Sequence, residues 1–204
     1  MIDLYAGPTS NSVRARFGLE ECGLAYKLHP IDLSKGEQKT PQFLAMNPNG
    51  AVPVIVDPEG PGGRKVTLSQ SAAILLYLAE KTGKFLPKDA ASRPELLQAL
   101  MNTCTDVTPM IGTVFGIIRG KDPHMPTAEM FKVRLKNYFK VWDDELGRHK
   151  YCVGNEVSIV DFSLYAGYWR ANGVIPDTCA GFANLERWAK EIGARPGIQR
   201  ALKF

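Results

Sequence analysis

The sequence predicts a small α/β unit with a mixed sheet, followed by a part that is built only of helices. Two observations lead to this fold class. Short apolar runs alternate with helical patterns over roughly the first 80 residues. No strand pattern occurs after residue 90. Since 204 residues suffice for one or two domains, we expect one domain at 1–82, a linker at 83–89 and a helical domain at 90–204.

The elements of the first domain are expected in the order βαβαββα. The first strand, 2–5, is a short apolar run, and the first helix begins near Asn11 and ends at Gly23, a residue type favoured at helix C-caps. Arg14 and Arg16 fall on the polar side of that helix. The elements that follow are a strand, a helix, two strands and a helix, at 26–33, 41–46, 52–57, 65–68 and 72–81.

The second domain shows helical patterns throughout. Ser158 and Asp161 have the spacing of a capping box, which predicts the start of a helix. A further helix is expected at 185–192, before Gly193. Apolar residues three and four positions apart form the stripe of an amphipathic helix, namely Phe131, Leu135, Tyr138, Trp142 and Leu146.

Composition and charge exclude several classes of protein. With 45% apolar and 23% charged residues, the chain has the composition of an ordinary globular protein. A net charge of +4 is too weak to favour a nucleic-acid partner. No apolar run has the length of a membrane-spanning helix, and the N-terminus lacks the features of a signal peptide. We therefore expect a cytoplasmic protein with no membrane partner.

The cysteines and histidines do not form any familiar motif. Four cysteines and three histidines are widely spaced along the chain. Structural zinc sites and redox dithiols need short spacings, so we expect no metal and reduced thiols. Cys22 lies well inside the first helix and is expected to be a buried apolar residue.

Three features are candidates for chemistry. The first is Val52-Pro53 at the start of a predicted strand. Because proline cannot donate to a ladder, it belongs at a sheet edge or a bulge. A cis bond there would turn the backbone groups of Val52 toward a peptide-like ligand. An ordinary trans proline at an edge strand is the alternative.

The second feature is Gln70-Ser71 at the start of a helix, where free N–H groups favour an anion such as a carboxylate. The alternative is that Ser69 or Ser71 only caps the helix. The third feature is the polar turn before the first helix, which can stabilise a thiolate by hydrogen bonds or serve as cap and turn. It consists of Thr9, Ser10, Asn11 and Ser12.

In a thioredoxin-like arrangement these three features converge on one groove, which suits a thiol tripeptide with carboxylate ends. The sequence also resembles the soluble glutathione transferases over essentially its whole length, and most closely their bacterial Nu class. The general resemblance lies in Leu44–Val54, Leu68–Leu78, Thr82–Pro87 and Ser158–Asp161, and the class resemblance in Asp3–Tyr5, Pro8–Asn11 and Lys35–Gln38.

The resemblance implies a thioredoxin-like domain, an all-helical domain and a glutathione site. Thr9 and Asn11 would face the sulfur, with Ser10 and Ser12 as rival hydroxyls. Val52 would pair with the cysteinyl part beside a cis Pro53. Ligand ends would be held by Gln70 and Ser71 at the γ-glutamyl carboxylate and by Gln38 and Asn49 near the glycyl end.

The resemblance further implies an enzyme that activates glutathione for disulfide reduction or for conjugation to a small electrophile, and a homodimer. Its substrate is glutathione, reduced or oxidised, and no metal takes part. An electrophile pocket is expected near Met110, Phe115 and Ile118 from their position alone. The alternatives are a non-catalytic binding or regulatory module on the same scaffold, and a glutathione-dependent dehalogenase or ether-cleaving enzyme.

Overall fold

The computed structural model describes residues 1–203. They form two compact units, one made of Met1–Lys84 with the C-terminal segment that begins at Pro196, and one made of Phe85–Arg195. The division between Lys84 and Phe85 falls inside the expected linker, 83–89. The expected domain limits themselves stay a prediction. The segment from Pro196 groups with the first unit, whereas the range 90–204 assigned it to the helical domain.

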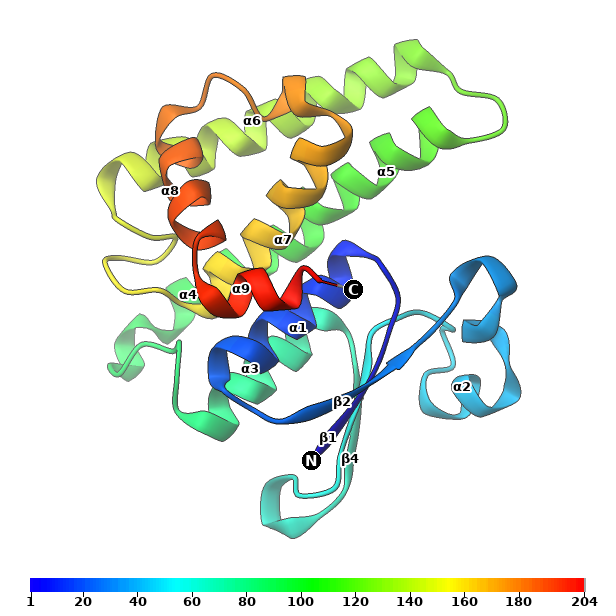
Figure 1. Cartoon of the computed structure of the whole chain (residues 1–204). Coiled ribbons are helices and arrows are strands. Elements are labelled where there is room, and N and C mark those ends of the chain that lie inside the picture. Colours follow the sequence, from blue (N-terminus) through cyan, green and yellow to red (C-terminus); the bar gives the residue numbers. More distant parts are fainter. Residues whose placement is uncertain (204) are drawn as a thin grey trace. The chain divides into compact units, whose positions relative to one another are not determined.

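The first unit is built on a four-stranded mixed sheet in the order β2-β1-β3-β4. Strand β1 is parallel to β2 and antiparallel to β3, and β3 is antiparallel to β4. The order of strands and helices confirms the predicted βαβαββα pattern and the α/β fold class (Figure 1). The strands are Ile2–Ala6 (β1), Tyr26–Pro30 (β2), Val54–Asp57 (β3) and Val66–Ser69 (β4).

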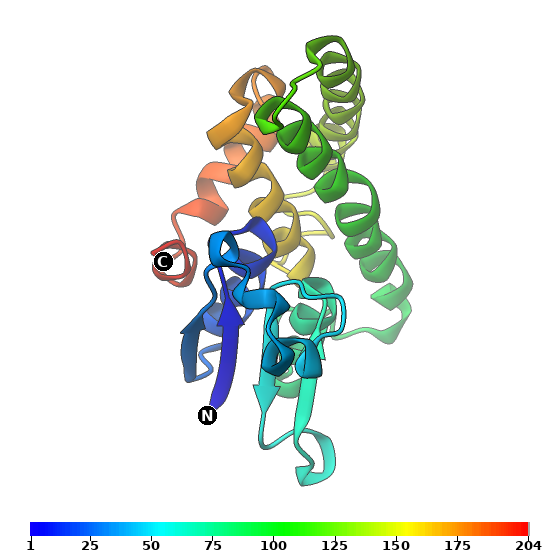
Figure 2. The same cartoon turned by 90° about the vertical axis from the view of Figure 1, so that its right-hand side faces the viewer.

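Helices cover both faces of this sheet. Helices α1 and α3 lie on one face and α2 lies on the other, as the two views in Figures 1 and 2 show. The C-terminal helix α9 packs against α1 although it is the last element of the chain. The helices of this unit are Ser10–Cys22 (α1), Pro41–Met46 (α2), Ser71–Thr82 (α3) and Pro196–Ala201 (α9).

Helix α1 is buried along most of its length, because α3 and α9 both pack against it. The expectation that Arg14 and Arg16 lie on a polar side was therefore wrong. Their exposed fractions are only 2% and 6%. Both guanidinium groups are buried, so their contacts must come from within the protein.

Two strand predictions also need correction. The strand expected at 26–33 ends at Pro30, because the Asp32 side chain accepts the Ser34 N–H at 2.9 Å and caps a 3₁₀ helix, Leu33–Lys35. Pro53 was expected at a sheet edge or a bulge, and the edge is excluded because β3 lies between β1 and β4. An inner position is possible because β3 begins only at Val54, so the proline precedes the ladder.

The regular elements of the second unit are all helices, as predicted. Its central helix α7 is buried on nearly all sides from Ile159 to Tyr168. On α6 the buried stripe includes Phe139 rather than the expected Tyr138. The main helices of this unit are Arg93–Asn102 (α4), Thr108–Arg119 (α5), Met125–Arg148 (α6), Ile159–Val174 (α7) and Ala183–Gly193 (α8), with a π-helical turn at Thr103–Val107.

The predicted capping box at the start of α7 is confirmed. The buried Asp161 carboxylate accepts hydrogen bonds from the backbone N–H of Ser158 at 2.8 Å and of Cys152 at 3.0 Å, and from the indole N–H of Trp188 at 2.8 Å. Asp161 thus ties α7 to the preceding loop and to α8.

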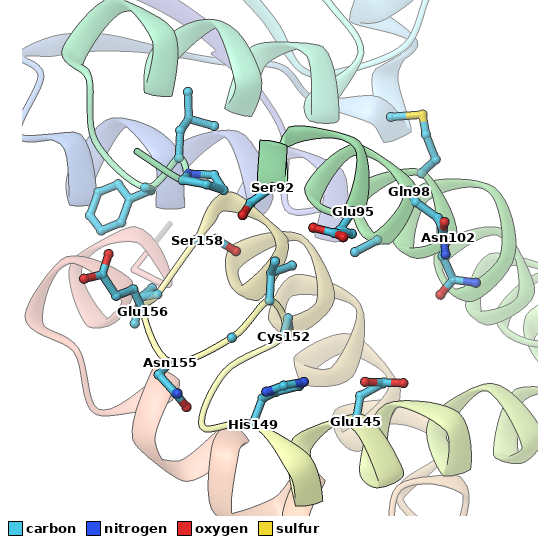
Figure 3. A pocket seen from close by; sticks show the side chains of 18 of the residues that line it. Ser92, Glu95, Gln98, Asn102, Glu145, His149, Cys152, Asn155, Glu156 and Ser158 are labelled. Atoms are coloured by element: carbon cyan, nitrogen blue, oxygen red, sulfur yellow. The ribbon is translucent and has the colours of Figure 1, made fainter. Parts of the chain in front are cut away.

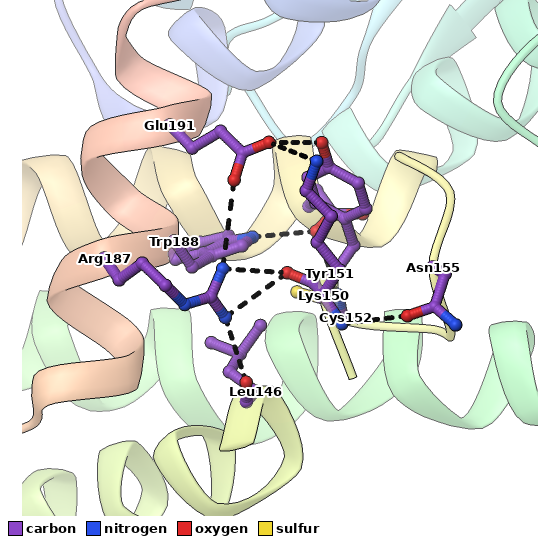
Figure 4. A network of polar contacts seen from close by, with 9 residues as sticks. Leu146, Lys150, Tyr151, Cys152, Asn155, Arg187, Trp188 and Glu191 are labelled. Atoms are coloured by element: carbon purple, nitrogen blue, oxygen red, sulfur yellow. Dashed lines mark hydrogen bonds and ion pairs between the residues drawn. The ribbon is translucent and has the colours of Figure 1, made fainter. Parts of the chain in front are cut away.

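A second polar network links the loop between α6 and α7 to α8 (Figure 4). The Glu191 carboxylate accepts from the Tyr151 hydroxyl at 2.5 Å and pairs with Lys150 at 3.1 Å. Arg187 donates to the Leu146 carbonyl at 2.9 Å. Among residues 1–203, no helix is both long and apolar enough to cross a bilayer.

Candidate functional site

The start of α1 is a tightly bonded turn. Thr9 is the N-cap, and its hydroxyl accepts from the Ser12 N–H at 3.1 Å and donates to Ser12 Oγ at 3.0 Å. Ser12 is fully buried, and its Oγ also accepts from the Gly7 N–H at 3.3 Å. Ser12 therefore holds the strand-to-helix turn together from inside, whereas Thr9 and Ser10 are half-buried.

Asn11 and Ser71 come together at the starts of α1 and α3. The Ser71 hydroxyl lies 3.4 Å from the Asn11 carboxamide oxygen. Between them lies the buried guanidinium of Arg14, whose Nη1 donates to Asn11 Oδ1 at 2.9 Å and to Ser71 Oγ at 2.7 Å. Asn11 is exposed, and Ser71 is 7% exposed. Asn11, predicted to face the ligand sulfur, and Ser71, predicted to hold a ligand carboxylate, are thus linked through Arg14.

Arg14 was missed by the sequence interpretation. Its spacing of three residues from Asn11 was a usable signal, because such residues are neighbours on a helix surface. Its contact with Ser71 had no local signal, since the two residues are 57 positions apart.

The start of α3 has an unusual backbone. Gln70 is its N-cap, with φ 70° and ψ 107°, a conformation that is uncommon outside glycine. No side chain caps the helix. The alternative that Ser69 or Ser71 only caps α3 is therefore wrong. The first N–H groups of α3, together with the positive end of the helix dipole, remain suited to an anion.

The peptide bond between Val52 and Pro53 is cis, as the resemblance implied. Val52 is 9% exposed and packs in a cluster with Phe43 and Val54, against which Tyr5 is also packed. This cluster fixes the segment just ahead of β3.

The chain segments that contain Gln38 and Asn49 are in contact. Lys39 Nζ donates to the Asn49 carbonyl at 3.3 Å. Gln38 lies on a 3₁₀ helix, Glu37–Lys39, and its Oε1 is buried without a hydrogen-bond donor among the described residues. Within residues 1–203, no hydrogen bond links this pair to Asn11 or Ser71. The convergence of the three sequence features on one groove stays a prediction.

Three of the protein's own thiols, those of Cys22, Cys152 and Cys179, are poor nucleophiles because they are buried. All four cysteines are free, and burial raises the pKa of Cys22, of Cys152 and of Cys179, the last to about 11. Cys22 is 4% exposed, which confirms that it is a buried residue. Within residues 1–203, no three metal-binding side chains gather at one place.

A cavity of about 1060 Å³ lies within the helical unit. Glu95 and Gln98 on α4 face it, and so do Glu145 and His149 at the end of α6 (Figure 3). None of the predicted glutathione contacts lines it, and neither do Met110, Phe115 and Ile118. The electrophile pocket at these three residues stays a prediction.

Comparisons with known proteins agree with this architecture. Residues 9–81 match the family model "Glutathione S-transferase, N-terminal domain", and residues 110–203 match the C-terminal domain model. The chain is 34% identical to the Escherichia coli disulfide-bond oxidoreductase YfcG, covering 99% of this chain and 94% of that protein. It is 30% identical to YghU of the same organism, covering 98% of this chain and 73% of YghU.

Solved structures that resemble this chain are also glutathione transferases. A glutathione transferase family member from Pseudomonas fluorescens, described with two glutathione molecules bound, superposes with a TM-score of 0.90 at 32% identity, covering 99% of this chain and 92% of that one. A Pseudomonas putida glutathione transferase with glutathione disulfide bound gives a TM-score of 0.90 at 31% identity, covering 100% of this chain and 91% of that one. On both domains, therefore, the chain belongs to the glutathione S-transferase family of enzymes.

Proposed function

We propose that the first unit binds glutathione, reduced or oxidised, and ionises its thiol for attack on a disulfide or on a small electrophile. The observation that carries this proposal is the meeting of Asn11 and Ser71 at two helix starts. Both starts favour negative charge, and glutathione has a carboxylate at one end and a thiol that can ionise near its middle. The similar proteins described with glutathione or its disulfide bound support this choice of ligand.

In this proposal each end of the tripeptide has its own contacts. Ser71 and the first N–H groups of α3 hold the γ-glutamyl carboxylate, with Gln70 beside the amino group. The backbone of Val52 pairs with the cysteinyl part, in the manner of an added strand. Gln38 and Asn49 take the glycyl end.

Thr9 and Asn11 stabilise the sulfur as a thiolate. A free thiol has a pKa of about 8.5, so only a few per cent is ionised at neutral pH. Lowering that pKa by about two units is worth about 2.7 kcal/mol and makes most of the thiol a thiolate. The Asn11 amide, the α1 dipole and the Thr9 hydroxyl can together supply this energy. Thr9 must then turn its proton from Ser12 Oγ to the sulfur.

The glutathione thiolate can react in two ways, by disulfide reduction or by conjugation. In disulfide reduction it attacks one sulfur of the substrate, forms a mixed disulfide and releases the other sulfur as a thiolate. A second glutathione thiolate then displaces the remaining substrate thiolate and leaves glutathione disulfide. In conjugation it attacks an electrophilic carbon and displaces the leaving group with its electron pair. Similarity to two disulfide-bond oxidoreductases favours the first route.

We also propose that the protein works in the cytoplasm as a homodimer. Free cysteines fit a reducing compartment. Size-exclusion chromatography with light scattering measures the assembly state, and a mass of one chain at micromolar concentration would contradict the dimer.

One experiment separates the candidate functions. Calorimetry with reduced and with oxidised glutathione measures binding, and turnover is then assayed with 2-hydroxyethyl disulfide, 1-chloro-2,4-dinitrobenzene, a hydroperoxide and a haloalkane. Turnover of the disulfide or the chloroarene supports the proposal. Binding without any turnover indicates a non-catalytic module, and turnover of the haloalkane alone indicates a dehalogenase. Absence of binding at millimolar glutathione overturns the proposal.

A further inference from the structure

Arg14 is a buried cation at the centre of the candidate site. Its side chain comes from the second turn of α1 and is 2% exposed. One nitrogen, Nη1, donates to Asn11 Oδ1 at 2.9 Å and to Ser71 Oγ at 2.7 Å. A guanidinium nitrogen of this kind has two hydrogens, so one atom serves both acceptors.

The chemistry of arginine decides how Asn11 is oriented. A guanidinium can only donate hydrogen bonds, so the Asn11 carboxamide must turn its oxygen toward Arg14. Its Nδ2 then points away from the guanidinium. Because Asn11 is exposed, its two N–H donors are available to a ligand. With Arg14 absent, the carboxamide can turn over and present its oxygen instead, which repels a thiolate.

The same argument determines where the Ser71 hydroxyl can donate its proton. Since Ser71 Oγ accepts from Arg14, its single proton must be donated elsewhere. It points to Asn11 Oδ1 at 3.4 Å, a long contact to an oxygen that already accepts from Arg14. A ligand carboxylate offers a stronger acceptor, so this proton is easily redirected to it.

We propose that Arg14 is a positioning residue that makes Asn11 and Ser71 hydrogen-bond donors toward the thiolate and the γ-glutamyl carboxylate of glutathione. The inference rests on the proposed function and adds the residue that couples the two ends of the ligand. Arg14 does not touch the ligand in this account. It acts through the orientation of two other side chains, and its buried positive charge favours anions at both helix starts.

The chain contains a matched control. Arg16 lies on the same helix and is buried to a similar degree, at 6% exposed. Its guanidinium donates to the Tyr26 hydroxyl at 3.2 Å and to the Lys203 carbonyl at 3.0 Å. Arg16→Met therefore removes a buried guanidinium from α1 without altering the contacts of Asn11 and Ser71.

The test compares the wild-type protein with Arg14→Met and Arg16→Met, using reduced glutathione as the ligand. Calorimetry gives the Kd, and ultraviolet absorbance of the thiolate during a pH titration gives the pKa of the bound thiol. We expect Arg14→Met to weaken binding about tenfold, as the loss of an oriented donor to a charged group does. The pKa of the bound thiol should also rise by about one unit. Arg16→Met should leave both values unchanged.

The outcomes separate this inference from the proposed function. If the wild-type protein does not bind glutathione, the proposed function fails. If it binds and lowers the thiol pKa, but Arg14→Met gives the same Kd and pKa, the positioning role is overturned while the proposed function stands. Equal losses in Arg14→Met and Arg16→Met also overturn it, since they indicate a structural effect alone.

Two further variants keep the test decisive if Arg14→Met does not fold. Arg14→Lys keeps the charge but carries its N–H donors on a flexible stem, so it holds the two acceptors less firmly. The Kd and the pKa of the bound thiol should therefore both rise, by less than in Arg14→Met. Combining Arg14→Lys with Ser71→Ala should weaken binding by less than the product of the two single effects, because Arg14 acts through Ser71. Unchanged values for Arg14→Lys, or fully independent effects, contradict the inference.

Discussion

The Ser71 hydroxyl lies 3.4 Å from the Asn11 carboxamide oxygen, although 60 positions separate the two residues. This contact joins the first turns of α1 and α3, the two longest helices of the first unit. Each helix start favours negative charge. A ligand with two anionic groups can therefore use both starts at once, and a change at one of them alters the hydrogen bonds of the other.

Replacement of Ser71 by alanine should weaken binding of reduced glutathione about tenfold, which corresponds to the loss of one hydrogen bond to a carboxylate. Calorimetry measures this effect. Ser69→Ala is the matched control, since Ser69 ends β4 and makes none of the contacts of Ser71. Equal affinity of wild type and Ser71→Ala would show that the carboxylate binds elsewhere.

Replacement of Thr9 by alanine should lower kcat more than it raises KM, because the hydroxyl is assigned to the thiolate. Thr9 is also the N-cap of α1, so Thr9→Ala should lower the free energy of unfolding by about 1 kcal/mol. Thr9→Ser keeps the hydroxyl and should retain both activity and stability. A loss of stability with an unchanged kcat and pH profile would leave Thr9 with only its capping role.

Changing all four cysteines to serine should leave glutathione-dependent disulfide reduction largely intact. The reason is that burial raises the pKa of Cys22, Cys152 and Cys179 and disfavours their thiolates. Circular dichroism checks that the variant folds. Loss of the activity in a folded variant would indicate that a protein thiol takes part in the reaction.

Asp161→Ala should destabilise the helical unit by several kcal/mol, because each buried N–H left without an acceptor costs about 1–3 kcal/mol. The buried carboxylate accepts from Ser158, Cys152 and Trp188, and its removal leaves these donors unsatisfied. Asp144→Ala is the control, because Asp144 is exposed and pairs with the exposed Lys140, so its loss should cost at most about 0.5 kcal/mol. Chemical denaturation measures both values.

The Glu191 network should make stability depend on pH. The Tyr151 hydroxyl, followed by Lys150, lowers the pKa of Glu191 below its ordinary value of 4.5. Stabilisation is therefore present above that value and is lost as the pH falls through the lowered pKa. Tyr151→Phe should lower the Tm at neutral pH, and this difference should shrink as the pH falls below 4.5 and through the lowered pKa of Glu191. A difference that is constant with pH would contradict the assignment.

Much of the fold follows from local signals that the sequence carries. Gly23 ends α1 with φ 73°, and Ser158 caps α7 with Asp161, both at the expected positions. Helix α2 spans the expected range 41–46, with Thr40 as its N-cap. These features depend on neighbours within a few residues, so a pattern of residue types suffices to predict them. The order of strands and helices follows from periodicity in the same way.

The sequence by itself thus determined the fold class, the element order and the polar groups offered at the starts of α1 and α3. Only the tertiary structure decided that α9 covers α1, that β3 is an inner strand, and that Arg14 is buried between Asn11 and Ser71. The physical reason is that burial and hydrogen-bond partners depend on which distant segments meet. An arginine on an amphipathic pattern has the same local sequence whether it faces solvent or is covered by another helix.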